Sequence, residues 1–214
     1  MIKAIIFDFD GVILESNKAK GLAFVELFKN QDHKFKKQIY EFHINNISKD
    51  RDFKIKQITN KIIKGTSTNK NISLLSKKFS KIVIQKVIKS KYILGAKKFL
   101  KNYSTIYDFH LSTATPYTEI ISILEKKKIF KYFNSINGSP DSKDKHIKKI
   151  LNHWKYKKNE IIFIGDSLND YKVAKKNGII FYGIQNEFNK FDKTNFKFSD
   201  FYQIEKMLKK KYHK

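Results

Sequence analysis

Short apolar runs alternate with longer amphipathic stretches along most of the chain. Each run ends at a polar residue or a glycine, which is typical of a strand that is buried on both faces of a sheet. Four runs have this character: Ile2–Phe7, Ile106–Ser112, Ile161–Gly165 and Ile179–Ile184.

Helical periodicity follows the strand-like runs in the second half of the chain. Apolar residues recur at i, i+3, i+4 and i+7 within residues 147–154, and residues 201–208 repeat that spacing. Such stripes predict amphipathic helices. Strands that alternate with helices in this way predict an α/β fold, namely a doubly wound parallel sheet with helices on both faces.

The segment 16–90 interrupts the alternation. It contains helical stripes, such as that within residues 72–82, but no run that is typical of a strand. Breaks between helices are expected at Gly65-Thr66-Ser67 and at residues 69–73. We therefore expect two domains, a core of residues 1–15 and 91–214 and a small helical domain of residues 16–90 inserted after the first strand. A small edge strand near 196–198 and a final helix complete the prediction.

Composition adds a large positive charge without identifying a partner. The formal net charge is +25 at pH 7, and Arg51 is the one arginine among 45 Lys and Arg residues. The lysines are spread over every segment, so we interpret the charge as drift in an AT-rich genome and expect no nucleic acid partner.

The remaining composition indicates a cytoplasmic protein. The chain has no cysteine, which excludes disulfides and thiolate metal sites. No apolar stretch reaches the ~20 residues that a membrane span needs. The N-terminal segment meets acidic residues too early for a signal peptide. We therefore expect neither a membrane contact nor secretion.

Candidate chemistry gathers at the ends of three predicted strands, where ligands bind in open parallel sheets. Asp8 and Asp10 follow the first strand, and residues two apart in an extended stretch can face one site. The second strand leads into the hydroxyl-rich segment 112–115, and Asp166 and Asp170 follow the third. Several carboxylates from distant segments are therefore expected to converge.

Such a group of carboxylates requires cations, because the charges would otherwise repel each other or become protonated. Oxygen ligands without Cys or His suit Mg²⁺ better than Zn²⁺. Lys143, which follows the turn-like residues 138–141, is the candidate for a second cation. Mg²⁺, a lysine and hydroxyl donors around a carboxylate favour phosphoryl transfer, where catalysis is mainly positioning and charge neutralisation.

Four motifs resemble those of the haloacid dehalogenase-like hydrolase superfamily, and they occur in the same order. The first motif corresponds to FDFDGV, the second to LSTATP, the third to GSPDSK and the fourth to FIGDSLND. Together they cover essentially the whole chain. The resemblance implies a Rossmann-like core, a Mg²⁺ cofactor and membership of the capped phosphatase branch, which includes phosphoglycolate phosphatase-like and beta-phosphoglucomutase-like enzymes.

The resemblance also implies roles for the carboxylates. Asp8 is expected to be the nucleophile that forms an aspartyl-phosphate, and Asp10 the general acid and base. The Asp8 carboxylate, the Asp10 backbone carbonyl and Asp166 would hold Mg²⁺, with Asp170 supporting the metal shell. Dehalogenases proper lack an acid at the position of Asp10, since halide needs no proton to leave, so this residue favours phosphate chemistry.

Phosphate binding is expected from the second and third motifs. By the resemblance, Thr113 and the backbone N–H of Ala114 would bind phosphoryl oxygens, with Ser112 as the alternative to Thr113. Lys143 would bridge Asp8 and the phosphate.

The insert is expected to act as a cap. In relatives, a helical insert after the first motif closes over the substrate, excludes water and reads the leaving alcohol. Segment 16–90 matches in position and contains Arg51. We predict that the planar fork of Arg51 grips a carboxylate or phosphate of the substrate, with an ordinary salt bridge or retention by chance as the alternatives.

The sequence therefore predicts a Mg²⁺-dependent phosphatase that hydrolyses a small phosphorylated metabolite. A phosphotransferase or sugar-phosphate mutase of the same superfamily would carry identical motifs, and this alternative stays open. A phospho-acceptor receiver domain has no need of the second carboxylate at Asp10 or of an insert. A basic nucleic-acid-binding protein would gather its lysines and aromatic residues in one stripe.

Overall fold

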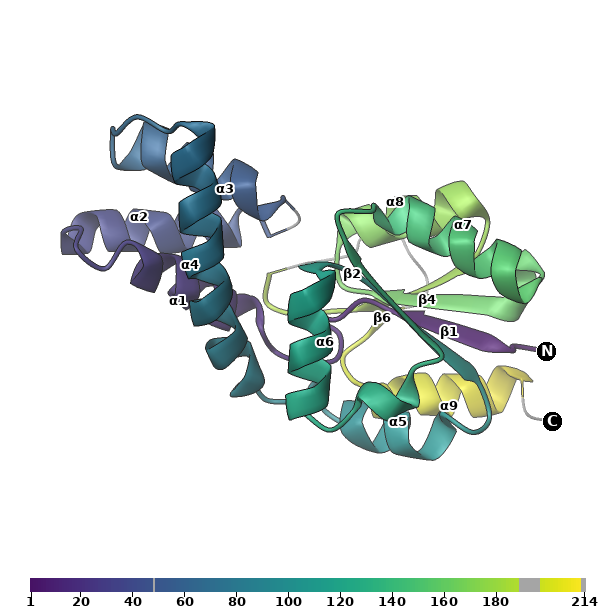
Figure 1. Cartoon of the computed structure of the whole chain (residues 1–214). Coiled ribbons are helices and arrows are strands. Elements are labelled where there is room, and N and C mark those ends of the chain that lie inside the picture. The colour runs from purple at the N-terminus through teal and green to yellow at the C-terminus, as the bar shows by residue number, and fades with distance from the viewer. Residues whose placement is uncertain (48, 189–196, 213–214) are drawn as a thin grey trace. The chain divides into compact units, whose positions relative to one another are not determined.

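The computed structural model describes residues 1–47, 49–188 and 197–212, and the chain divides into two compact units (Figure 1). One unit consists of Met1–Glu15 and Lys91–Lys214, and the other of Ser16–Ser90. The division falls where the alternation of strands and helices was expected to break.

The first unit is built on a six-stranded sheet in the order β3-β2-β1-β4-β5-β6, with neighbouring strands parallel. This confirms the doubly wound parallel sheet. β1 lies at the centre, where the strand order changes direction, and Phe7 pairs with Leu111 of β2 and Ile164 of β4. The strands are β1 Ala4–Phe7, β2 Asp108–Pro116, β3 Ser135–Ser139, β4 Ile161–Gly165, β5 Ile180–Ile184 and β6 Lys197–Phe198.

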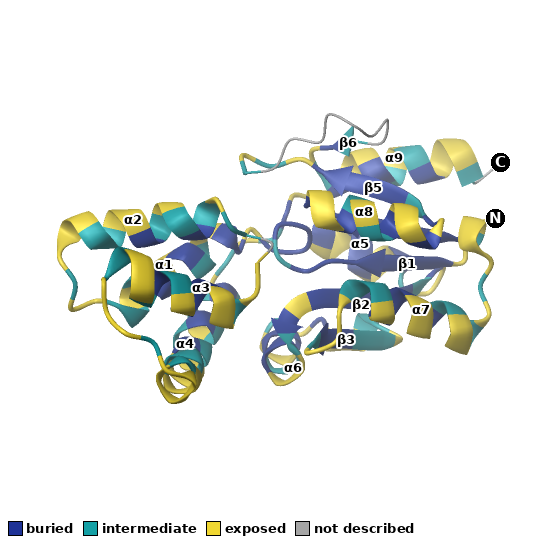
Figure 2. Cartoon of the chain, turned by 90° about the horizontal axis from the view of Figure 1, so that it is seen from above, coloured by how far each residue is buried: buried dark blue, intermediate teal, exposed yellow. Residues whose placement is uncertain are grey.

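Helices cover both faces of this sheet (Figure 1). On one face the strands pack against Ile147 of α7 and Ala174 of α8. On the other, Phe7 contacts Phe99 of α5 and Phe201 of α9. In Figure 2 the central strands are dark blue, whereas α7, α8 and α9 carry yellow exposed segments, as expected for helices with one apolar face. The helices are α5 Ala96–Tyr103, α6 Tyr117–Lys126, α7 Lys143–Trp154, α8 Leu168–Asn177 and α9 Phe201–Tyr212, with short 3-10 helices at Phe130–Tyr132 and Lys158–Glu160.

The second unit is helical, as predicted. Its described residues, 16–47 and 49–90, contain no strand. The rings of Phe24 and Phe79 lie 4.2 Å apart between α1 and α4 in its interior. The elements are α1 Asn17–Leu27, α2 His33–Ile44, α3 Arg51–Gln57, a π-helix at Ile58–Ile62 and α4 Asn69–Ile88.

Three local predictions differ from the structure. The break expected at residues 69–73 is wrong, because Thr68 accepts a hydrogen bond from the Asn71 N–H and α4 starts at Asn69. β2 runs from Asp108 to Pro116 instead of from Ile106 to Ser112. β3 was not predicted, since its sequence SINGS is polar and only partly buried at the sheet edge.

Two further features bear on the predictions at the end of the chain and on membrane contact. β6 agrees with the small edge strand expected near 196–198, although residue 196 itself lies outside the described residues. Among the described helices, none combines the length and the apolar character that crossing a bilayer requires.

Candidate active site

Asp8 lies directly after the central strand of the sheet. Its backbone N–H donates to the Ile164 carbonyl at 2.9 Å, and the residue is only 7% exposed. Carboxylate Oδ1 accepts a hydrogen bond from the Phe9 N–H at 2.6 Å, and Oδ2 lies 2.6 Å from Lys143 Nζ. Burial raises the pKa of Asp8 to about 6, with Lys143 opposing the rise. The carboxylate is thus buried, oriented and paired with a cation.

Lys143 joins two of the carboxylates. It is the first residue of α7, and its side chain is 10% exposed, with Nζ 2.6 Å from Asp8 and 2.5 Å from Asp170 Oδ1. Burial alone would lower the pKa of Lys143, but the ion pairs with Asp170 and Asp8 raise it well above its usual value. Lys143 therefore stays charged and holds the two carboxylates together.

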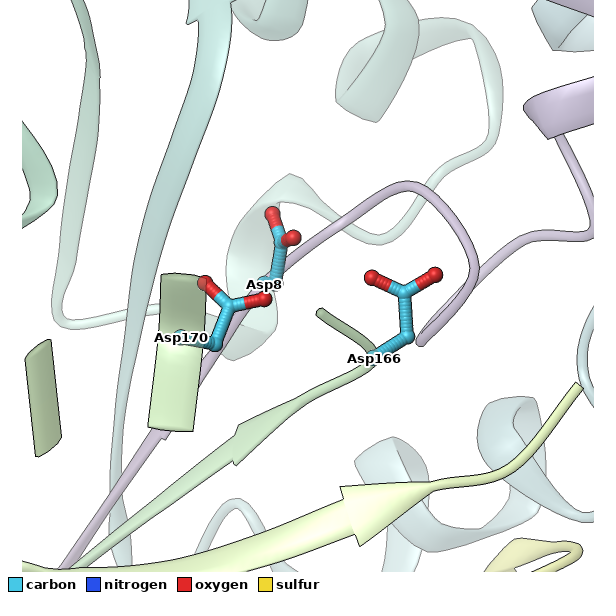
Figure 3. A group of neighbouring side chains, drawn as sticks. All are labelled: Asp8, Asp166 and Asp170. Atoms are coloured by element: carbon cyan, nitrogen blue, oxygen red, sulfur yellow. The ribbon is translucent and has the colours of Figure 1, made fainter. Parts of the chain in front are cut away.

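Three carboxylates form one group at this end of the sheet (Figure 3). Asp8, Asp166 and Asp170 each offer an oxygen, and these oxygens all lie within 4.8 Å of one another. Asp166 follows β4 directly and is 2% exposed. Its burial, together with the charges of Asp8 and Asp170, raises its pKa to about 8. Carboxylate oxygens this close to one another need a proton or a cation between them. The group therefore suits a hard divalent ion.

Asp170 is held by the start of α8. Its Oδ2 accepts hydrogen bonds from the Ser167 hydroxyl at 2.6 Å and the Ser167 N–H at 3.1 Å, while the Asp170 N–H donates to Ser167 Oγ. This reciprocal cap fixes the side chain. A Cβ on Gly165 would lie 2.8 Å from Asp170 Cγ, so the glycine makes room for the carboxylate. Asp170 Oδ1 is paired with Lys143 and Oδ2 with Ser167, so both oxygens are engaged, which suits a supporting position.

The end of β2 presents the predicted hydroxyl segment. Thr113 and Thr115 are 1% and 4% exposed, and the Thr115 N–H donates to Thr113 Oγ1 at 3.1 Å. Ala114, between them, is exposed. Ser112, the alternative to Thr113, is fully buried with its hydroxyl 3.0 Å from His146 Nδ1. Ser112 is thus engaged with α7 whereas Thr113 contacts Thr115, so the two hydroxyls have different partners.

Asp10 stands two residues after Asp8 in the loop that leaves β1. Its Oδ2 accepts a hydrogen bond from Thr115 Oγ1 at 3.1 Å. Gly11 follows with φ +76°, a left-handed conformation that other residues rarely adopt, and its N–H donates to the Leu14 carbonyl. The loop therefore turns sharply beside Asp10.

The sequence predictions gave no role to two residues of this region. The predictions named Thr115 only as part of the hydroxyl segment and assigned it no partner, whereas in the structure it contacts Asp10. Asn186 follows β5, and its side-chain Nδ2 donates to Asp166 Oδ2 at 3.0 Å. The same rule that identified the other residues, namely to inspect the polar residues just past each strand, would have drawn attention to Asn186.

Arg51 belongs to the second unit and makes contacts within it. Its Nη1 donates to Ser80 Oγ at 2.8 Å, and its guanidinium lies over the Phe79 ring, 4.8 Å from the centroid. These contacts join α3 to α4. The contact between Arg51 and a substrate stays a prediction.

Comparison with known proteins identifies related sequences and folds. The family model described as haloacid dehalogenase-like hydrolase matches residues 5–184. A search of functionally curated proteins found no match. Among solved structures, a predicted phosphoglycolate phosphatase from Haemophilus somnus is 19% identical with a TM-score of 0.80, and the alignment covers 96% of this chain and 97% of that one.

Two further solved structures have the same fold. The putative hydrolase YfnB from Bacillus subtilis, bound to magnesium, is 18% identical with a TM-score of 0.78 over 97% of this chain and 98% of its own. CbbY from Rhodobacter sphaeroides, in complex with phosphate, is 15% identical with a TM-score of 0.78 over 95% and 96%.

The match to the family model extends from the first strand to the fifth and contains all four motifs. The chain belongs to the haloacid dehalogenase-like hydrolase family.

Proposed function

We propose that the protein is a Mg²⁺-dependent phosphatase that hydrolyses the phosphomonoester of a small metabolite through an aspartyl-phosphate on Asp8. The observation that carries the proposal is the buried Asp8 carboxylate, paired with Lys143 Nζ at 2.6 Å and grouped with Asp166. Solved structures of this fold include a predicted phosphoglycolate phosphatase and a complex with phosphate, which supports phosphate chemistry.

The donor set fits Mg²⁺. Asp8 and Asp166 would hold the ion through their carboxylates and Asp10 through its backbone carbonyl, while Asp170 would support the site by orienting Lys143. When bound, Mg²⁺ would neutralise charge on the phosphoryl oxygens. One relative of this fold was crystallised with magnesium, which supports the choice of ion.

In the first step, an Asp8 oxygen attacks phosphorus while the bond from phosphorus to the leaving oxygen breaks. Asp10 gives its proton to that oxygen, so the substrate departs as a neutral alcohol. Thr113, the Ala114 N–H and Lys143 bind the phosphoryl oxygens and stabilise their charge.

In the second step, Asp10 takes a proton from water, and the resulting hydroxide attacks the phosphorus of the aspartyl-phosphate. Phosphate leaves and the Asp8 carboxylate is restored. Asp10 favours an oxygen leaving group over halide, because halide needs no proton. We propose that the unit Ser16–Ser90 acts as the cap that keeps bulk water from this intermediate.

Phosphate release from a panel of phosphorylated metabolites, with p-nitrophenyl phosphate included, tests the proposal. Wild-type protein should release phosphate in the presence of Mg²⁺, and this release should stop when EDTA is added. Asp8→Asn keeps the side-chain shape and should lose activity by about a thousandfold or more, since it removes the nucleophile. Activity that survives in Asp8→Asn, or a panel without any turnover, would contradict the proposed function. Isomerised sugar phosphate in place of free phosphate would indicate a mutase.

A further inference from the structure

The end of β2 contacts Asp10 through a residue that has no assigned role. Thr113 and Thr115 lie beyond Leu111, the last residue of β2 that pairs with β1. The register of β2 with β3 shifts between Ser112 and Pro116, and both threonine side chains are buried in this irregular stretch. Thr113 is the expected phosphate ligand, which leaves the function of the Thr115 hydroxyl to be explained.

Thr115 contacts both the expected phosphate ligand Thr113 and Asp10. Its backbone N–H donates to Thr113 Oγ1, and its side-chain Oγ1 donates to Asp10 Oδ2, both at 3.1 Å. Thr115 is 4% exposed, so water competes little for its hydroxyl. Asp10, in contrast, is only partly buried and lies in the loop after β1.

We infer that Thr115 is a positioning residue for Asp10, which it holds through Oδ2 so that Oδ1 carries the proton to the leaving oxygen. The inference rests on the proposed function and adds a residue to it. In the first step the proton passes from Asp10 Oδ1 to the oxygen that leaves phosphorus, and Oδ2 accepts the Thr115 hydrogen bond before and after.

A neutral hydroxyl suits this task better than a charged partner. A carboxylic acid has one donor and retains acceptor capacity on its other oxygen, so the Thr115 O–H can donate to Oδ2 in both protonation states of Asp10. A lysine in the same place would favour the ionised form and oppose the acid step. The hydroxyl therefore orients Asp10 without fixing its charge.

The test compares Thr115→Val with wild type on phosphate esters whose leaving groups differ in basicity. Valine keeps the shape and the backbone N–H that holds Thr113, and it removes only the hydroxyl. A nitrophenolate leaves without proton donation, so kcat/KM for p-nitrophenyl phosphate should fall by no more than about threefold. An alkoxide needs the proton, so kcat/KM for alkyl phosphates should fall by about 10². Thr115→Ser, which keeps the hydroxyl, should restore most of this loss.

A double-variant comparison separates positioning from a structural effect. If Thr115 acts through Asp10, adding Thr115→Val to Asp10→Asn should lower kcat/KM for the alkyl phosphate little further. An equal loss on every ester, or no loss on any, would overturn the inference while leaving the proposed function intact. Wild-type protein without phosphatase activity would instead overturn the proposed function, and the inference with it.

Discussion

Asp166→Asn is expected to make the metal-free protein more stable at pH 8. Burial of Asp166 is the largest cause that raises the pKa of its carboxyl from 3.8 to about 8, and the charges of Asp8 and Asp170 contribute to the same rise. The folded state therefore binds this proton more tightly than the unfolded chain does. The contribution of this proton to folding stability is fully present below about pH 4 and is lost as the pH rises from about 4 to about 8. Asparagine cannot ionise, and its side-chain oxygen can still accept the hydrogen bond from Asn186.

The magnitude follows from the size of this rise. About four pKa units correspond to about 6 kcal/mol, of which about 4 kcal/mol falls between pH 5 and pH 8. Protein relaxation and entry of water relieve part of the burial penalty. We therefore expect the stability of Asp166→Asn relative to wild type to increase by about 2–4 kcal/mol between these pH values. The ionised Asp166 carboxylate therefore lowers the stability of the metal-free protein at pH 8.

Urea denaturation in EDTA at pH 5 and pH 8, followed by circular dichroism and by the fluorescence of Trp154, measures this difference. The comparison between variant and wild type cancels the titration of groups outside the site. Adding Mg²⁺ at pH 8 should stabilise wild type and have much less effect on Asp166→Asn. Asp141→Asn, at an exposed position, is the matched control and should show no such gain. A relative stability that stays constant between pH 5 and pH 8 would refute the electrostatic reasoning.

Three other substitutions test separate contacts. Gly165→Ala places a methyl group against Asp170 and should cost about 1–3 kcal/mol of stability by chemical denaturation and lower kcat at least tenfold; normal activity would contradict the close packing. Asn186→Leu removes the donor to Asp166 and should raise the Kd for Mg²⁺ about tenfold by titration calorimetry, so an unchanged Kd would exclude a role in the metal site. Arg51→Lys should lower kcat/KM on the true substrate at least about tenfold if the planar fork grips it, and an unchanged value would leave Arg51 only its contacts within the helical unit.

The fold was largely predictable because the central strands carry a strong signal. Residues 4–7 and 161–165 are buried throughout, so their sequences read as continuous apolar runs. β3 lacks that signal, since it lies at an edge and contains Asn137 and Gly138 in place of apolar residues. The start of α4 was misplaced because polar residues in its first turn were taken for a break, although Thr68 caps the helix.

The candidate site was predictable where a residue follows a strand directly. Asp8 and Asp166 each come immediately after a central strand, and the topology alone brings these positions together. The partners of such residues depend on tertiary geometry, which a single sequence does not contain. Thr115 and Asp10 are far apart in the chain, and a threonine in a hydroxyl-rich segment gives no sign of the carboxylate that it holds.

The most direct test of the central claim is to trap the covalent intermediate on Asp8. The enzyme would be quenched in acid during turnover of p-nitrophenyl phosphate with Mg²⁺, and then treated with borohydride, which reduces an aspartyl-phosphate to homoserine. We expect peptide mass spectrometry to find homoserine at position 8 in samples that contained both substrate and Mg²⁺. Steady turnover with Asp8 unmodified, or with the label at another carboxylate, would contradict the account.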